Sequence, residues 1–176
     1  TAVRRWVRRH DRMLTDPFGR RSVRANMHPG PNSRDTTGPS GPEDPDLSVL
    51  AVQSKQGRPI ALLANFANHY VGAPAVDADY FGVFADRIQE LLEADRQDPP
   101  FVGILSNGAS ADINNINWPQ RAQQSPARYE QMTKVARDVA QTVHQAYQAM
   151  EFQEWVQLGA EQSEITLAVR KPTPEQ

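Results

Sequence analysis

The stretch LSVLAVQSKQGRPIALLANF, residues 47–66, decides the fold. Residues 47–53 alternate apolar with other side chains, and residues 60–66 form a nearly continuous apolar run. Residues 54–58 between them combine polar side chains with Gly57, which is typical of a turn. This arrangement predicts a β-hairpin whose second strand is buried.

The chain beyond this hairpin predicts two helices and two further strands. Residues 80–92 and residues 126–150 place apolar side chains at three- and four-residue spacings, which indicates amphipathic helices. Residues 101–105 predict a buried strand, and residues 165–170 predict another whose partner lies beyond the end of this chain. The order β-β-α-β-α-β predicts a single α/β domain, with a mixed β-sheet flanked by helices.

The segment before the hairpin differs from the rest in composition. Residues 1–14 are basic and fit a short strand or helix, whereas residues 15–46 are rich in Pro, Gly, Asp, Asn and Ser and predict a long loop. We therefore divide the chain into a basic, Pro/Gly-rich loop segment, residues 1–46, and an α/β domain, residues 47–176. The 176 residues include no cysteine, which excludes disulfides, thiolate nucleophiles and cysteine-ligated zinc.

Positive charge is concentrated at the N-terminus. The first 34 residues contain nine arginines and two acidic residues, although the net charge of the chain is -2. Such a segment either binds nucleic acid or an anionic surface, or forms a solvated strip that packs on acidic parts of a larger protein. Little aromatic interleaving and no recognisable nucleic-acid module favour the second interpretation, so we expect no nucleic-acid partner. No run approaches the ~20 apolar residues of a membrane span, so we expect no transmembrane segment.

His69 is the one histidine in a position suited to a zinc ligand. It follows a predicted buried strand directly, where a neutral imidazole fits a metal site; a histidine hydrogen-bonded within a loop is the alternative. Asp77 and Asp79 stand just ahead of the predicted helix. Their carboxylates either orient a ligating histidine or cap the helix. A catalytic zinc needs about three protein ligands, so the local set is incomplete.

The stretch SNGASADINN, residues 106–115, follows the next buried strand. Asparagine and glycine tolerate positive φ, so this backbone folds tightly and is suited to presenting N–H groups to an oxyanion. Ser110 is a candidate nucleophile or hydrogen-bond donor. A purely structural turn is the alternative, because the stretch matches neither a nucleophile elbow nor a phosphate-binding loop.

Two blocks of the sequence resemble a known family. NFANHYVG, residues 65–72, followed by DADYFG, residues 77–82, is similar to the zinc-histidine region of the neutral/alkaline non-lysosomal ceramidases, especially their bacterial relatives of unassigned substrate. FVGILSNGASADINN, residues 101–115, resembles the downstream strand and active-site loop of that family. Order and spacing agree, and the resemblance covers about residues 45–118.

The resemblance implies a zinc-dependent hydrolase of N-acyl amide bonds, in which metal-activated water attacks the amide carbonyl. It implies that His69 is a zinc ligand and that Asp79 is the acidic residue close behind it. The loop after residue 105 would line the site. The implied site residues in this loop are Ser110, Asp112 and Asn114 as catalytic candidates, with Asn107, Gly108 and Asn115 lining the site.

The sequence also departs from the family pattern. The upstream His-x-His segment and the downstream glutamate and tyrosine ligands have no match here, and Asn114 or Asn115 stands where ceramidases carry a serine. The chain begins without methionine, so we expect an internal piece of the N-terminal catalytic domain that is inactive alone. The resemblance implies that the parent is secreted or periplasmic and acts on a lipid-like or other N-acyl amide. A non-catalytic binding or structural domain that retains the fold is the alternative.

Overall fold

The structure of the protein is a computed structural model. It describes residues 3–4, 6–8, 14–15, 17–22, 25–26, 36–39, 41–74, 76–111, 113–115, 127, 129–169 and 171.

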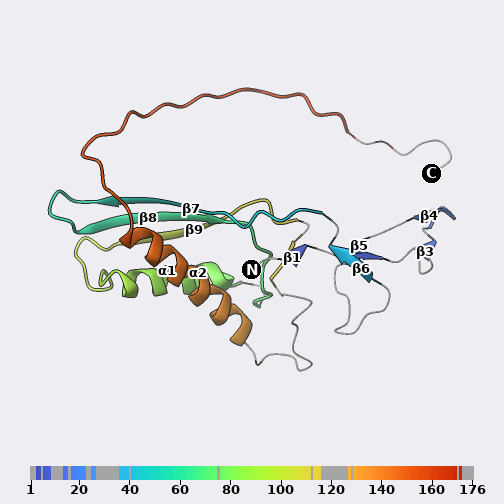
Figure 1. The fold of residues 1–176 in the computed structure, drawn as a ribbon, viewed down its shortest axis with the longest axis horizontal. Helices are drawn as coiled ribbons and strands as arrows, with labels where there is room; N and C mark the ends of the chain where they lie inside the picture. Colours follow the sequence, from blue (N-terminus) through green and yellow to red (C-terminus); the bar gives the residue numbers. More distant parts are fainter. Residues whose placement is uncertain are drawn as a thin grey trace.

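The centre of the fold is a three-stranded mixed sheet (Figure 1). Strands β7 (Leu47–Gln53) and β8 (Pro59–Phe66) are antiparallel, and β9 (Val102–Asn107) is parallel to β8. The hairpin turn closes through a 2.9 Å hydrogen bond from the Gly57 N–H to the Ser54 carbonyl, and the φ of 82° at Gly57 is one that glycine adopts without strain. The predicted hairpin and the predicted α/β class with a mixed sheet are therefore confirmed.

Two helices cover one face of this sheet (Figure 1). They are α1 (Asp79–Leu91) and α2 (Glu130–Gln148), and they pack against each other as well as on the strands. Their apolar stripes meet alternate residues of β8, so that Leu62 and Ala64 are buried. The core consists of Leu62, Ala64, Tyr80, Phe84, Ile88, Ala94, Phe101, Leu105, Ala136, Val139, Ala140 and Val143.

The opposite face of the sheet is open. Leu63 is paired with Leu50 on one side and with Ile104 on the other, and all three side chains are exposed. The prediction that β8 is buried holds only for the face toward the helices. The apolar run was misleading because the described residues include nothing that covers the second face.

Short antiparallel strands occupy parts of the N-terminal segment. The expectation of a continuous loop over residues 15–46 is wrong to that extent, while residues 1–14 contain strand rather than helix. Most of these strands have two residues, too few for an alternating pattern to show in the sequence. The pairs are β1 (Val3–Arg4) with β10 (Ile113–Asn114), β3 (Leu14–Thr15) with β4 (Arg21–Ser22), and β2 (Trp6–Arg8) with both β5 (Ala25–Asn26) and β6 (Thr36–Pro39).

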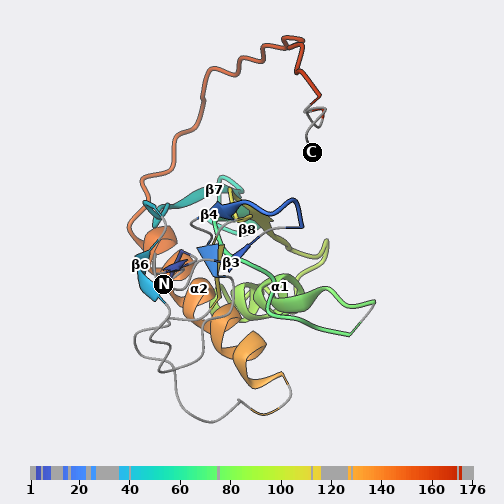
Figure 2. The ribbon, with the colours of Figure 1, turned by 90° about the vertical axis from the view of Figure 1, so that its right-hand side faces the viewer.

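The C-terminal segment leaves the body after α2. Residues 151–169 contain no helix or strand, and they arch over the side of the sheet opposite the helices (Figures 1 and 2). The strand predicted at residues 165–170 is therefore not formed within its described part, because an alternating pattern makes a strand only where a partner completes the hydrogen bonds. In the part of the chain that the structure describes, no helix has the length and apolar character to cross a membrane.

Candidate functional site

Two loops meet where the parallel strands β8 and β9 end. The Gly108 N–H donates to the Phe66 carbonyl at 3.0 Å, which ties the loop after β9 to the end of β8. A Cβ atom at Gly108 would lie 3.2 Å from the backbone of Ala67, so glycine permits this close approach. In α/β sheets, ligands bind outside the carboxyl ends of the strands. The two loops singled out from the sequence therefore form one candidate site.

His69 is half-buried at this edge of the sheet. Its Nδ1 lies 2.9 Å from the carbonyl oxygen of Tyr70. A carbonyl oxygen only accepts hydrogen bonds, so this contact places the proton of the neutral imidazole on Nδ1. Nε2 then keeps its lone pair, and a backbone carbonyl that fixes the opposite nitrogen is a common support for a metal-binding histidine.

The carbonyl of Tyr70 also joins the second loop to the first. The Asn115 side-chain amide donates to it at 2.5 Å, and the Asn115 carbonyl accepts a 2.7 Å hydrogen bond from Gln131 Nε2. Asn115 thus links the loop that holds His69 to the first turn of α2. Asn115 and His69 therefore share the Tyr70 carbonyl as a hydrogen-bond partner, and the network adds Gln131, which no sequence pattern indicates.

Asp79 is buried, with 6% of its surface exposed. Its Oδ1 accepts hydrogen bonds from the N–H groups of Val71 (3.2 Å) and Tyr80 (2.7 Å). Its Oδ2 accepts hydrogen bonds from the N–H groups of Gly72 (2.9 Å) and Ala73 (3.1 Å). Burial alone would raise the pKa of this carboxyl, but these four backbone donors outweigh burial and lower the pKa below 3.8. Asp79 therefore holds the loop that follows His69, as a carboxylate.

This geometry corrects the expected role of the two aspartates. In the described residues, the ring of His69 is hydrogen-bonded to the Tyr70 carbonyl, which accepts from Nδ1, and Asp79 accepts from backbone amides instead. Asp77 Oδ1 accepts the N–H of Asp79 at 2.7 Å, so Asp77 stabilises the beginning of α1. The sequence alone could not decide between orienting a histidine and stabilising the helix, because a carboxylate just before a helix is suited to both roles.

Ser110 lies in the second loop with its hydroxyl bonded to an amide. Asn107 Nδ2 donates to Ser110 Oγ at 2.8 Å, and the Asn68 N–H donates to Asn107 Oδ1 at 3.5 Å. An amide accepts no proton from a serine hydroxyl, so this contact positions Ser110 without activating it. The arrangement suits a hydrogen-bond donor to a substrate better than a nucleophile.

The remaining predicted loop residues have different surroundings. Asn114 is buried in β10, opposite Val3 of β1, so the N-terminal strand runs along the rim of the site. Gly108 packs against Ala67, as described above. Asp112 lies outside the described residues, as do His10 and His28.

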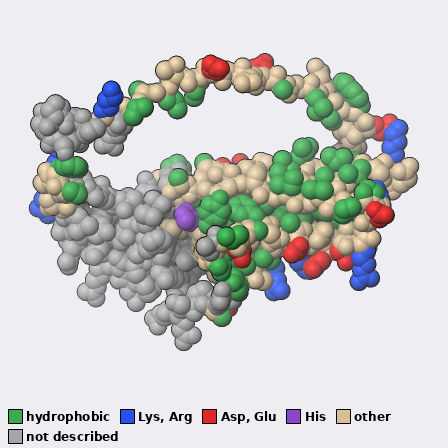
Figure 3. All heavy atoms as spheres, turned by 180° about the vertical axis from the view of Figure 1, so that it is seen from behind, with side chains coloured by type: hydrophobic (Ala, Val, Ile, Leu, Met, Phe, Trp, Pro, Cys, Tyr) green, Lys and Arg blue, Asp and Glu red, His purple; other side chains and the backbone are tan. Residues whose placement is uncertain are grey.

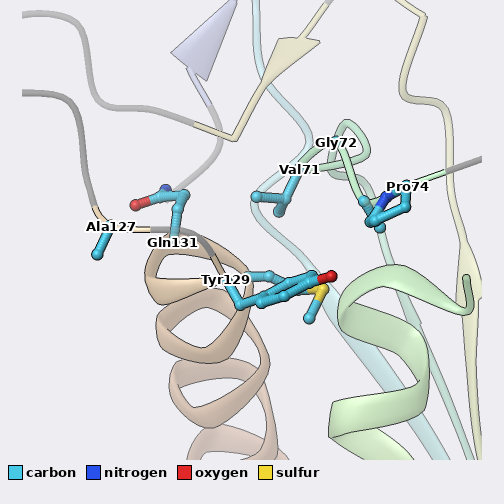
Figure 4. A pocket seen from close by; sticks show the side chains of 8 residues that line it. Val71, Gly72, Pro74, Ala127, Tyr129 and Gln131 are labelled. Atoms are coloured by element: carbon cyan, nitrogen blue, oxygen red, sulfur yellow. The ribbon is translucent and has the colours of Figure 1, made fainter.

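A cavity of about 390 Å³ lies between residues 71–74, in the loop that follows His69, and the start of α2. The aromatic ring of Tyr129 extends from the start of α2 below Val71 and Pro74, whereas the side chain of Gln131 points away from this ring (Figure 4). Asp79 fixes its wall, because the same carboxylate holds the N–H groups of Gly72 and Ala73. The lining is formed by Val71, Gly72, Ala73, Pro74, Ala127, Tyr129, Gln131 and Met132.

The described residues do not contain a complete set of metal ligands. They include no group of three or more His, Asp or Glu side chains that could hold a metal ion. The other described histidine, His144, is half-buried on α2 and takes no part in the loop network. His69 fits zinc in its tautomer and position, but these residues alone do not make a zinc centre.

Comparison with known proteins identifies no relative. No protein-family model, no curated protein and no solved structure matches the chain.

Proposed function

We propose that this chain supplies part of the active site of a zinc-dependent hydrolase that cleaves N-acyl amide bonds. One observation carries the proposal: the Tyr70 carbonyl fixes Nδ1 of His69, at the carboxyl end of a central strand, so that Nε2 is free to bind a metal. The resemblance of residues 65–82 and 101–115 to the neutral ceramidases supports the same assignment.

The chain's own residues would divide the work as follows. His69 would be one of about three protein ligands, the others coming from outside the described residues. Bound zinc would supply Lewis acidity toward the amide carbonyl. Ser110 and the backbone N–H groups of the loop 106–111 are suited to donate hydrogen bonds to a developing oxyanion. The cavity between residues 71–74 and α2, with Val71, Pro74 and Met132 in its lining, fits an apolar acyl group.

The test is zinc stoichiometry by elemental analysis. It is measured on this chain and on a longer chain from the same reading frame, each with and without His69→Ala. We expect about one zinc per longer chain, lost with His69→Ala and retained with His144→Ala as the matched control. Hydrolysis of a fluorogenic N-acyl amide should follow the bound zinc. Zinc retained in the His69→Ala variant of the longer chain would contradict the assignment.

A non-catalytic binding or structural domain is the second candidate. It is favoured by the incomplete ligand set among the described residues and by Ser110, whose hydrogen-bond partner is an amide rather than a base. This candidate predicts that neither chain binds zinc and that His69→Ala changes only the free energy of unfolding. The same measurement therefore separates the two functions.

A further inference from the structure

The segment Ile165–Val169 has the pattern of a strand but pairs with nothing that the structure describes. Ile165, Leu167 and Val169 alternate with Thr166 and Ala168, and the three larger side chains are 75%, 78% and 81% exposed. β-Branched residues at this spacing favour a pleated, half-buried strand. Three apolar side chains in a row on an extended segment call for a partner surface.

The sheet offers an open edge to such a strand. Its order is β7-β8-β9, so in the described part of the chain β9 is hydrogen-bonded on one side only. The outward side chains of β9 are exposed as well: Val102 is 50% exposed and Ile104 48%. An uncovered edge beside apolar side chains is a template for another strand.

The handedness of chain crossovers selects the edge. Connections between parallel strands of one sheet are right-handed in nearly all proteins. The unit β8-α1-β9 moves from β8 to β9 with α1 on one face, and α2 lies on that same face (Figure 1). A right-handed connection from β9 through α2 must therefore continue in the same direction, to the side of β9 that faces away from β8. The edge of β7 would require a left-handed crossover.

The linker is long enough to reach this edge. The hydroxyl of Tyr147 lies 3.4 Å from Gln53 Oε1, so α2 ends beside the end of β7, where β8 and β9 begin. Residues 151–164 span up to about 45–50 Å when extended. Three strand spacings separate β7 from a strand on the far side of β9, or about 15 Å. A strand that starts from this end of the sheet runs parallel to β9.

We propose that residues 165–169 form a fourth strand of the sheet, parallel to β9 and paired with its free edge. The proposal includes a register: Leu167 is placed opposite Ile104 on the outer face, because there it extends the exposed apolar row that Ile104 forms with Leu63 and Leu50. Hydrophobic side chains (green) gather on the body beneath the tail and recur along the tail itself (Figure 3). Pairing would cover both sets at once.

Thiol cross-linking tests this pairing without background, because the chain has no cysteine. Ile104→Cys is combined with Leu167→Cys, and the matched control combines Leu50→Cys, on β7, with Leu167→Cys. A short bifunctional thiol reagent should link the first pair within one chain and leave the control pair unlinked. Preferential linkage of the control pair, linkage only between chains, or no linkage in either pair would overturn the proposal.

Hydrogen exchange gives a second measurement that is independent of the introduced thiols. In the wild-type chain, every second amide within residues 165–169, the set that faces β9, should exchange on the order of tenfold more slowly than the amides of residues 153–158. Thr166 and Leu167 direct their N–H groups to opposite sides of the strand, so one of the two variants Thr166→Pro and Leu167→Pro should abolish this protection, whereas Ser163→Pro, in the linker, should preserve it. Equal exchange in the two segments of the wild-type chain would refute the fourth strand.

Discussion

The carboxylate of Asp79 determines the shape of the loop that follows His69. It accepts four backbone N–H groups, three of them from the loop and one from the beginning of α1. The backbone of Asp79 has a φ of 50°, which Asp and Asn tolerate better than most residues. The sequence marked Asp79 as important beside a helix start, but the identity of its partners depended on how residues 71–73 fold back, which no local pattern encodes.

Asp79→Asn should therefore destabilise the protein near neutral pH. The amide has one acceptor oxygen where the carboxylate has two, so it leaves buried N–H groups unpaired, at a cost of roughly 2–3 kcal/mol in the free energy of unfolding. Urea denaturation at pH 7 measures the loss. Asp86→Asn, an exposed position on α1, is the control and should change stability little.

The same carboxylate predicts a dependence of stability on pH. The pKa of Asp79 is lower in the folded state than in the unfolded chain, so below about pH 4 the unfolded state binds more protons. Its contribution is complete above the unfolded pKa and is lost as the pH falls through the folded pKa. Denaturation curves from pH 7 to pH 2 should show a smaller acid loss in Asp79→Asn than in the wild type. An equal loss in both would contradict a lowered pKa.

The helices and the three central strands could be predicted because each carries its own periodicity. The stripe Tyr80-Phe84-Ile88 marks α1, and the turn at Gly57 marks the hairpin. Elements that depend on a distant partner could not be predicted: β1 pairs across more than a hundred residues with β10. For residues 165–169 the sequence predicts too much structure instead of too little. Their alternating pattern is that of a strand, but the structure places them apart from the sheet.

Close packing between α1 and β9 depends on Gly103. A Cβ atom there would lie 2.8 Å from Ile88 Cγ2 and 3.2 Å from Phe101 Cε1, inside the buried core. Gly103→Ala should therefore lower the free energy of unfolding by about 1–3 kcal/mol through overpacking. Gly159→Ala is the matched control, because its Cβ would meet nothing within 4 Å. Chemical denaturation of both variants measures the difference, and equal stabilities would show that α1 shifts freely over β9.

The molecule as a whole combines a packed body with an uncovered sheet. One face of the sheet is sealed by α1 and α2, and the other presents Leu50, Leu63 and Ile104 in a single row. The candidate site is also incomplete in the described residues. The loops 66–74 and 106–115 contribute His69, Asn115 and part of the cavity wall. The described residues include no group of three or more potential metal ligands. Sequence spacing located the two loops, because both follow buried strands. It could not reveal the hydrogen bond on Nδ1 of His69, which depends on the course of the backbone.

Limited proteolysis should separate the packed body from the tail. Glu154, Glu161 and Glu164 lie in exposed chain without helix or strand, whereas Glu90 is equally accessible on its surface but belongs to α1. A protease cuts an extended backbone directly, but a helix must first unfold locally, so a glutamate-specific protease should cut after Glu154 and Glu161 well before Glu90. Mass spectrometry of the first fragments identifies the order. Early cleavage at Glu90 would mean that α1 opens as readily as the tail, and the core would then not be the stable unit. Slow cleavage after Glu164 alone would locate protection next to Ile165, as pairing of residues 165–169 with β9 requires.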